Sequence, residues 1–346
     1  MSDTDAGPPE ASPAVTALRA VAFHLERTRA ETYRVRAYRK AADLLDSLDP
    51  GEVAARAAAG TLTDLKGVGA KTAAVATAAA SGQEPDYLVE LRAAAAPVAG
   101  GATLRAALRG DCHTHSDWSD GGSGILEMAR TARDLGHEWM VLTDHSENLT
   151  VANGLSPERR RRQFGVIAEV NAELAPFRLL RGIEVDILPD GEIDAPEDLL
   201  DELDLVVASV HSHLRSSSEE MTTRMVVGVS NPYVDVLGHC TGRLVTGGRG
   251  TRPPSTFDAE AVFDACVENG VAVEINSRPE RLDPPRPLLR QALAAGCEFV
   301  VDTDAHAPGQ LDWQPYGCER AEECEVGTDR VVNTRSCDDL LAWRTR

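Results

Sequence analysis

The chain has 346 residues, 42% of them hydrophobic, and carries a formal net charge of −20. A chain of this length can bury one large core and one small core, so we expect two domains. No apolar run reaches the ~20 residues of a membrane-spanning helix, which argues against a membrane protein. Residues 1–13 are polar and lack the basic and apolar regions of a signal peptide, so they are predicted to form a disordered tail.

The cysteines, together with the lack of a targeting segment, favour a cytoplasmic protein. There are seven cysteines, and no pair has the C-x-x-C spacing, which fits a reducing compartment where thiols pack as small apolar side chains. Cys318 and Cys324 lie in a polar stretch, and a metal or redox role for them stays open.

The charge is unevenly distributed along the chain. A net charge of −20 would repel nucleic acid, which is a polyanion. The lysines and a group of arginines nevertheless fall within residues 1–100: Lys40, Lys66, Lys71, Arg34, Arg36 and Arg39. The carboxylate excess lies downstream, so a locally basic front domain is expected to precede an acidic domain.

The front domain, residues 14–92, is predicted to be helical. Apolar residues recur at spacings of three and four, and Gly and Pro residues separate the helical segments. The expected helices are Val15–Arg29, Tyr33–Leu48, Pro50–Ala59 and Ala70–Ser81.

Residues 65–73, Leu-Lys-Gly-Val-Gly-Ala-Lys-Thr-Ala, have the form of the turn in a helix-hairpin-helix motif. In this interpretation Gly67, Val68 and Gly69 form a turn whose N–H groups, at the start of the next helix, bind a DNA phosphate. The positively charged candidates for DNA contact are Lys71, Arg36 and Lys40. The alternative is a glycine-containing link between helices that serves protein contacts alone.

A linker, residues 93–107, leads to the larger domain at residues 108–346. Strand-like runs alternate with helical periodicity there, which predicts parallel β/α units with right-handed crossovers. We therefore expect an α/β fold, a distorted seven-stranded (β/α)7 barrel. The expected strands are Leu108–His113, Trp139–Thr143, Leu179–Val185, Leu205–Val210, Val234–Gly238, Val271–Ile275 and Phe299–Asp302. Helices expected between them include Gly124–Leu135, Pro157–Leu174, Asp258–Glu268 and Pro287–Ala295.

Nine potential metal ligands stand where these strands are expected to end: His113, His115, Asp120, His145, Glu184, His211, His239, Asp304 and His306. Strand C-termini converge on one face of a β/α barrel, so these side chains are predicted to form one metal cluster. His113 and His115 are two residues apart on a strand end and therefore point the same way. Imidazole mixed with carboxylate suits Mn²⁺, Zn²⁺ or Fe²⁺.

Short motifs around these residues resemble, in order, the successive motifs of the PHP (polymerase and histidinol phosphatase) family. They lie at residues 111–121, 143–146, 182–184, 209–212, 238–243 and 302–306. The similarity is greatest to the PHP domain of bacterial family X DNA polymerases, through residues 151–156 and 274–277. The front domain resembles the N-terminal helix-hairpin-helix domain of the same polymerases.

The resemblance also identifies activities that are not expected. Between these two parts such a polymerase carries a nucleotidyl-transfer domain, whereas only a short linker intervenes here, so the chain should not polymerise DNA. In related eukaryotic polymerases a Schiff-base lysine follows the hairpin lysine by one helical turn. Val75 occupies that position here, so lyase activity is not expected.

By this resemblance the nine residues hold up to three divalent ions. The first ion would be held by His113, His115, Glu184 and Asp304, the second by Glu184, His211 and His239, and the third by Asp120, His145 and His306. Clustered divalent ions act as Lewis acids on phosphate and lower the pKa of water, which indicates phosphoester hydrolysis.

Two further residues are candidates for the catalytic machinery. Arg243, just past His239, either clamps a substrate phosphate with its paired N–H donors or lies in an exposed loop. Asp144, beside His145, either orients a ligand histidine or caps the strand end. The run Arg159–Arg162 is expected on a solvated helix face outside the barrel.

Three functions remain open. The first is a phosphoesterase that acts on DNA as a 3′–5′ exonuclease, a 3′-phosphatase or an abasic-site nuclease. The second is a small-molecule phosphatase that resembles histidinol phosphatase, and the third is a DNA-binding adaptor with structural metals. The complete ligand set disfavours the adaptor. The front domain favours DNA, whereas the acidity of the barrel favours a small ester.

Overall fold

The computed structural model describes residues 12–95, 100–247 and 250–344. The chain divides into two compact units, Met1–Pro97 and Val98–Arg346. Of the expected tail at residues 1–13, residues 1–11 lie outside the described residues, whereas Ser12 and Pro13 begin the first helix.

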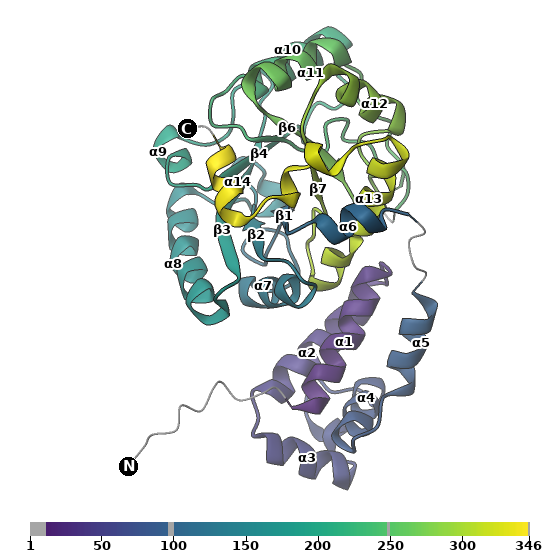
Figure 1. The fold of residues 1–346 in the computed structure, drawn as a ribbon. Coiled ribbons are helices and arrows are strands. Elements are labelled where there is room, and N and C mark those ends of the chain that lie inside the picture. The colour runs from purple at the N-terminus through teal and green to yellow at the C-terminus, as the bar shows by residue number, and fades with distance from the viewer. Residues whose placement is uncertain (1–11, 96–99, 248–249, 345–346) are drawn as a thin grey trace. The chain divides into compact units, whose positions relative to one another are not determined.

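The first unit is all-helical, as the sequence predicts (Figure 1). Its elements are α1 (Pro13–Arg27), α2 (Thr32–Asp46), α3 (Pro50–Ala59), the 3-10 turn η1 (Leu62–Asp64), α4 (Ala70–Ala80) and α5 (Asp86–Ala94). Side-chain caps define two of the helix starts. The Ser12 hydroxyl accepts the N–H of Val15 at 3.4 Å, and Asp49 accepts the N–H groups of Gly51 and Glu52 at 2.8 and 3.2 Å.

One arginine of the expected basic group lies inside this unit. Arg39 on α2 is buried and donates to both carboxylate oxygens of Glu26 on α1, at 2.9 and 2.7 Å. Such a two-pronged ion pair fixes one helix against the other. Arg39 therefore does not contribute to the exposed basic surface, to which Arg34, Arg36 and Lys40 do belong.

The second unit is an α/β barrel of seven parallel strands that follow one another in chain order around the sheet. They are β1 (Gly110–Thr114), β2 (Trp139–Leu142), β3 (Arg178–Asp186), β4 (Leu205–Ser209), β5 (Val236–Leu237), β6 (Ala272–Asn276) and β7 (Phe299–Asp302). The predicted fold class is confirmed, although β5 is shorter than the expected strand at residues 234–238.

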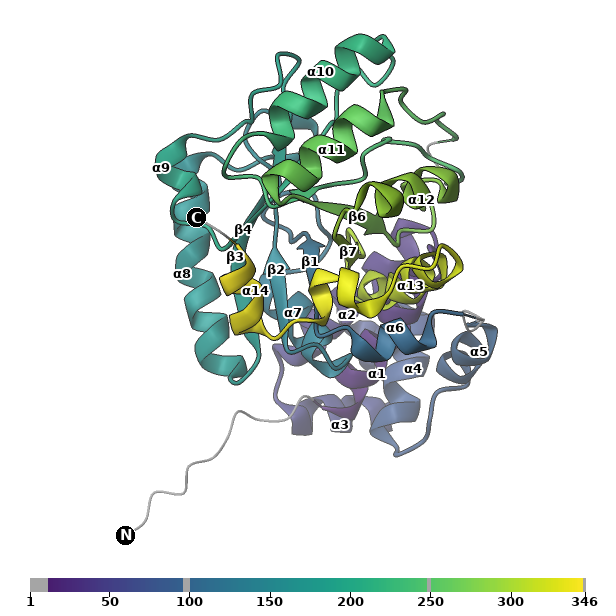
Figure 2. The ribbon, with the colours of Figure 1, turned by 45° about the horizontal axis from the view of Figure 1, so that its top comes forward.

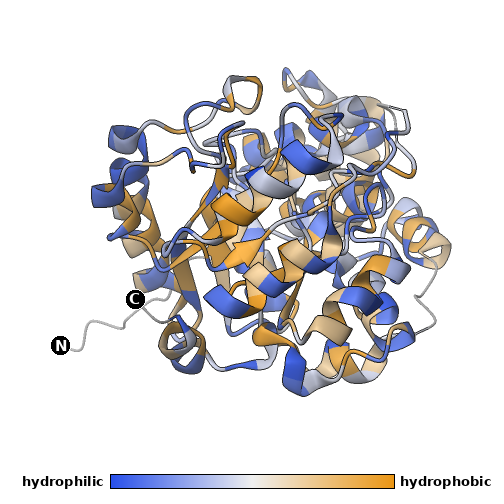
Figure 3. Ribbon diagram, turned by 90° about the horizontal axis from the view of Figure 1, so that it is seen from above, coloured by the Kyte–Doolittle hydropathy of each residue, from blue (hydrophilic) through white to orange (hydrophobic). Residues whose placement is uncertain are grey.

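Helices surround these strands (Figure 2). They are α7 (Ile125–Asp134), α8 (Pro157–Leu174), α9 (Glu197–Leu200), α10 (Ser218–Val229), α11 (Ala259–Asn269), α12 (Arg286–Ala295) and α13 (Gln314–Glu323). Hydrophobic residues concentrate on the strands and on the helix faces turned toward them (Figure 3). Among the described residues, no helix combines the length and the apolar character needed to cross a membrane.

Two buried aspartates join the edge strands β1 and β7. Asp302 at the end of β7 accepts the N–H of Cys112 in β1 at 2.8 Å, and Asp111 in β1 accepts the hydroxyl of Thr303 at 2.6 Å. Each strand therefore supplies an acceptor to the other. In the described sheet order, β1 and β7 are not paired by a regular ladder of hydrogen bonds. The bonds of the two aspartates help to close the distorted barrel between these strands.

Part of the segment expected to be linker is helical. Helix α6 (Ala102–Ala107) lies within residues 93–107, and its start is bonded to the barrel. The carboxylate of Glu322 on α13 accepts the N–H groups of Gly101 and Leu104, both at 3.0 Å. At the chain's end, α14 (Cys337–Trp343) places Leu340 against the core cluster that contains Trp139.

Candidate metal centre

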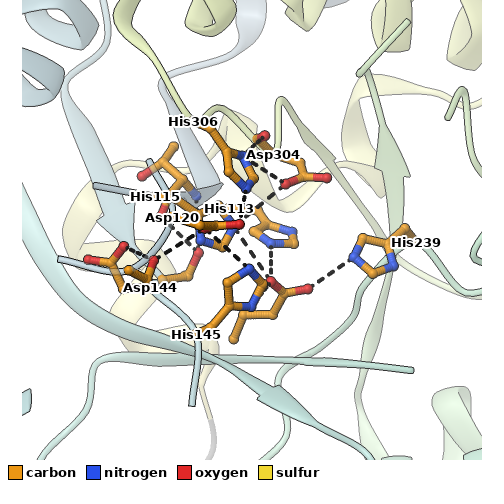
Figure 4. A network of polar contacts seen from close by, with 12 residues as sticks. His113, His115, Asp120, Asp144, His145, His239, Asp304 and His306 are labelled. Carbon is orange, nitrogen blue, oxygen red and sulfur yellow. Dashed lines mark hydrogen bonds and ion pairs between the residues drawn. The ribbon is translucent and has the colours of Figure 1, made fainter. Parts of the chain in front are cut away.

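The ends of the parallel strands bring the nine candidate ligands together at one mouth of the barrel. His113 lies in β1 and Glu184 in β3, while the other seven lie in the loops that follow β1, β2, β4, β5 and β7. The rings of His113, His115, His145 and His306 converge from different elements, with His239 at the edge of the group (Figure 4).

Glu184 is the centre of this arrangement. Its carboxylate is buried, and five imidazole nitrogens lie within 3.5 Å of its two oxygens. Oε1 lies 3.0 Å from Nε2 of His239 and 3.2 Å from Nε2 of His211, and Oε2 lies 2.9 Å from Nδ1 of His145, 3.2 Å from Nε2 of His113 and 3.5 Å from Nε2 of His115. A single carboxylate thus faces ring nitrogens from four other segments of the barrel.

Asp120 and Asp304 complete the cluster on its other side. Asp120 lies 3.3 Å from Nε2 of His306 and 3.6 Å from Nε2 of His145, and Asp304 lies 3.5 Å from Nε2 of His115. Three groups have ligand atoms that all lie within 4.8 Å of one another: His115, Asp120, His145 and His306; His113, His115 and Asp304; and His145, Glu184 and His211. This grouping resembles the expected ligand sets, with His115 and His145 each shared between two groups.

The donor set fits divalent cations. Among the described residues, neither oxygen of Glu184, neither ring nitrogen of His115, nor Nε2 of His113 has a well-aligned hydrogen-bond partner. Buried polar atoms without partners are costly, and a cation among them would satisfy the carboxylate and the ring nitrogens together. Mixed imidazole and carboxylate ligands are those of Zn²⁺, Mn²⁺ and Fe²⁺ sites.

The local electrostatics keep the carboxylate charged. Burial would raise the pKa of Glu184, but the neighbouring histidines, His113 first, hold it well below its usual range. Burial, together with His306, lowers the pKa of His115 to about 4, so this ring is neutral and can bind a metal at neutral pH. Burial also opposes protonation of His211, but Glu184 and Asp186 together outweigh it and raise the pKa of His211 to about 9. Metal binding at His211 therefore competes with a proton.

Strand β6 contributes residues that sequence reasoning noted only as part of a family motif. Glu274 is buried, its Oε1 lies 2.7 Å from Nδ1 of His113, and its Oε2 accepts the N–H of His239 at 2.5 Å. His113 therefore presents Nε2 to the cluster, because its Nδ1 proton is held by Glu274. Asn276 donates to both Glu274 and Asp304, at 3.2 and 3.3 Å. In the sequence, Glu274 and Asn276 lie two residues apart at the end of the expected strand Val271–Ile275. The candidate ligands have the same placement, and this is the signal that could have identified the two residues.

The arginines beside the cluster differ from the one expected. Arg243 donates from Nε to the carbonyl of Arg281 at 3.0 Å and from Nη2 to another carbonyl of the same loop. It therefore supports the loop after β6, and the phosphate clamp expected of it stays a prediction. Arg281 and Arg278, from that loop, lie beside the cluster: Arg281 Nε is 3.0 Å from Asp304, and Arg278 Nη1 is 3.2 Å from Nδ1 of His306.

Asp144, expected either to orient a ligand histidine or to cap the strand end, uses its carboxylate to bind the loop after β1 and helix α8. Among the described residues, one oxygen accepts the N–H of Ser116 at 2.7 Å and the hydroxyl of Ser119 at 2.5 Å. The other accepts the hydroxyl of Ser116 and the side-chain amide of Gln163, both at 2.6 Å. Asp144 thus anchors the loop that carries Asp120.

Comparisons with known proteins agree with this architecture. Residues 11–82 match the model of the helix-hairpin-helix domain, and residues 111–278 match that of the PHP domain. The chain is 38% identical over 239 residues to the DNA polymerase/3′-5′ exonuclease PolX of Bacillus subtilis. The matched region covers 69% of this chain and 41% of that protein. It is 30% identical over 237 residues to a protein of Caldanaerobacter subterraneus named as a probable phosphatase. That matched region covers 65% of this chain and 86% of the relative. This chain belongs to the PHP family.

A solved PHP-like structure gives a more distant comparison. Histidinol phosphate phosphatase from Lactococcus lactis, in complex with zinc, L-histidinol and phosphate, has 20% sequence identity and a TM-score of 0.48. The match covers 63% of this chain and 94% of that one. The chain spans less than half of the length of PolX, its longer relative.

The front unit of this PHP protein has the hairpin expected at residues 65–73. Gly67 has φ of +112°, a conformation that favours glycine, and Gly69 precedes the first residue of α4. The side chain of Val68 is buried and its N–H bonds within the turn, while the N–H of Gly69 donates to Thr72 at 3.0 Å. The exposed Lys71 lies in the first turn of α4, whose N–H groups are not used by the helix itself.

Proposed function

We propose that this protein hydrolyses phosphate esters at DNA ends or in damaged DNA, as a 3′–5′ exonuclease, a 3′-phosphatase or an abasic-site nuclease. The observation that carries the proposal is the convergence of nine candidate metal ligands on the mouth of a PHP barrel. A helix-hairpin-helix match in the same chain supports DNA as the substrate.

The nine residues would hold up to three ions, either Mn²⁺ or Zn²⁺. When bound, such ions polarise phosphate oxygens and lower the pKa of water. The protein contributes the surroundings of the reacting phosphate. Arg281 and Arg278 offer guanidinium donors that match phosphate oxygens, and their side chains are 16% and 24% exposed beside Asp304. Asp120, 33% exposed, marks the side of the cluster that is open to solvent.

The front unit would hold the DNA backbone. The proposed phosphate contacts, Lys71, Arg36 and Lys40, are among its exposed positive side chains. Contacts of this kind read phosphates rather than bases, so they would position a strand without selecting its sequence. This role agrees with an enzyme that acts on strand ends of any sequence.

A small phosphate ester is the second candidate substrate. The supporting observation is that the match to the probable phosphatase covers 86% of that protein's length but only 65% of this chain. The carboxylate excess of the barrel also disfavours a polyanion near the mouth.

Product analysis on oligonucleotides labelled at the 3′ or the 5′ end, with Mn²⁺ supplied, tests the proposal. Stepwise shortening or loss of a 3′ phosphate is expected, and a variant carrying Asp304→Ala and His306→Ala should form no product. Absence of any DNA product, together with hydrolysis of histidinol phosphate, would overturn the proposed substrate and favour the small ester.

A charge reversal in the hairpin tests DNA delivery separately. Lys71→Glu should lower turnover on long strands yet leave turnover of p-nitrophenyl phosphate unchanged, because the small ester does not need the front unit. Arg92→Glu on α5, where Arg92 pairs with Glu84 on the surface, is the matched control. An equal loss of turnover on long DNA strands and on p-nitrophenyl phosphate would contradict delivery of DNA by the hairpin.

A further inference from the structure

Helix α8 carries four consecutive arginines, residues 159–162, which the sequence places on a solvated face. The structure places Arg160 and Arg161 in different environments. Arg161 is 38% exposed and pairs with Asp198 and Glu202 at 2.8 and 2.7 Å, as expected of a surface residue. Arg160 is 0% exposed. A guanidinium that is fully buried loses its hydration, so its position calls for specific partners.

The partners of Arg160 are backbone carbonyls at the metal mouth of the barrel. Nη2 donates to the carbonyls of Asp144 and His145, at 2.5 and 3.1 Å, and Nη1 donates to that of Gly182 at 3.3 Å. His145 is itself a candidate ligand, and Gly182 precedes the candidate ligand Glu184 by two residues. Arg160 therefore ties the loop after β2, which carries His145, to the middle of β3, two residues before Glu184.

Gln163 extends this network toward the loop after β1. It is fully buried, and its side-chain oxygen accepts Nη1 of Arg160 at 2.9 Å. Its side-chain nitrogen donates to Asp144 at 2.6 Å. Asp144 in turn binds Ser116 and Ser119, which directly follow the ligand His115 and directly precede the ligand Asp120.

We infer that Arg160 and Gln163 are positioning residues for one ion of the cluster, the ion held by His115, Asp120, His145 and His306. This inference rests on the proposed metal centre. Asp144 links the pair to the loop that carries His115 and Asp120, and Arg160 holds the backbone of His145 directly. The fourth ligand has a partner outside this network, since the N–H of His306 donates to the side chain of Gln310 at 2.8 Å.

The network predicts a selective effect on metal binding. Its contacts reach His145 directly and the residues beside His115 and Asp120, which are three ligands of this ion. They reach Glu184 only through the carbonyl of Gly182, two residues away. His239 and Asp304 are positioned from β6 by Glu274 and Asn276. Groups that orient metal ligands typically change affinity by about 10- to 100-fold when removed. Loss of the network should therefore weaken binding of this ion more than binding of the others.

Equilibrium dialysis of the full-length protein against a series of free Mn²⁺ concentrations, with metal counted by mass spectrometry, tests this inference. Gln163→Met removes the amide while keeping the length of the side chain, and Arg160→Met removes the guanidinium. Arg161→Met, on the same helix, is the control. For Gln163→Met we expect the dissociation constant of one ion to rise about 10- to 100-fold, with smaller changes for the other ions and none for the control.

The outcomes separate this inference from the proposed function. Wild-type protein that binds fewer than three ions would contradict the trinuclear centre and would remove this inference with it. Wild-type protein that binds three ions, with Gln163→Met binding them equally well, would overturn the inference alone. Equal weakening of all ions, with a lower melting temperature of the metal-free variant, would show a general structural role and also overturn it. If Arg160→Met fails to fold, the result for Gln163→Met decides.

Discussion

Replacing Glu274 with glutamine tests how a buried carboxylate controls metal binding at His113. Glu274 uses both oxygens: one faces Nδ1 of His113 at 2.7 Å, and the other accepts the N–H of His239 at 2.5 Å. A glutamine has one oxygen and one amino group. Whichever way its amide turns, an N–H group faces another N–H group, and one of the two bonds is lost.

The size of the effect follows from the bond that is lost. Hydrogen bonds to a charged group contribute about 1.5–3 kcal/mol. Since each ~1.4 kcal/mol is a factor of ten, the affinity for the ion at His113 should fall roughly 10- to 100-fold. The same range applies to groups that orient metal ligands elsewhere. Loss of the negative charge near the cations acts in the same direction.

The assay is turnover of p-nitrophenyl phosphate as a function of free Mn²⁺. The Glu274→Gln variant should need about 10- to 100-fold more Mn²⁺ for half-maximal turnover, and its maximal turnover should approach that of the wild type. Glu298→Gln is the control, because Glu298 binds Arg335 and Trp343, in the C-terminal segment of the chain, away from the cluster. An unchanged Mn²⁺ requirement in a folded Glu274→Gln variant would refute the role of this carboxylate.

Three further predictions concern other residues. Glu184→Gln should lose bound ions and lower turnover by at least about a hundredfold, because the cluster's ions supply several kcal/mol of transition-state stabilisation; full metal content with normal turnover would contradict it. Arg281→Met should raise the KM for a phosphate ester about tenfold, the effect of one charge-assisted bond, without changing the metal content, and Arg281→Lys should recover part of the loss; an unchanged KM would exclude the contact. Burial lowers the pKa of His137 to about 3. Below about pH 6.5 the unfolded chain therefore binds a proton at this residue that the folded protein does not bind, and the stability of the fold decreases as the pH falls. Between pH 7.5 and pH 5 this loss is about 2 kcal/mol, and urea unfolding of His137→Asn should show that much less acid destabilisation; equal acid sensitivity would disprove the assignment.

The sequence by itself determined the class of fold and which candidate metal ligands lie close together. Alternation of strand and helix patterns predicts a parallel barrel, and a parallel barrel gathers its strand ends at one mouth whatever the details of packing. His113, His145 and His239 could therefore be placed together from their positions after separate expected strands. The helical front unit followed from apolar spacing and from the turn at Gly67, which adopts a conformation that glycine tolerates.

Only the tertiary structure decided which polar side chains face the cluster and which are buried elsewhere. Arg243, Arg160 and Arg39 look alike in sequence, yet one supports a loop, one binds backbone carbonyls beside the cluster and one pairs inside the helical unit. Glu274 contacts His113 across 161 positions of sequence, and Arg281 reaches Asp304 from another loop. The period of a strand or helix determines the face on which a side chain lies. Its partners depend on contacts between distant segments, and these exist only once the barrel has closed.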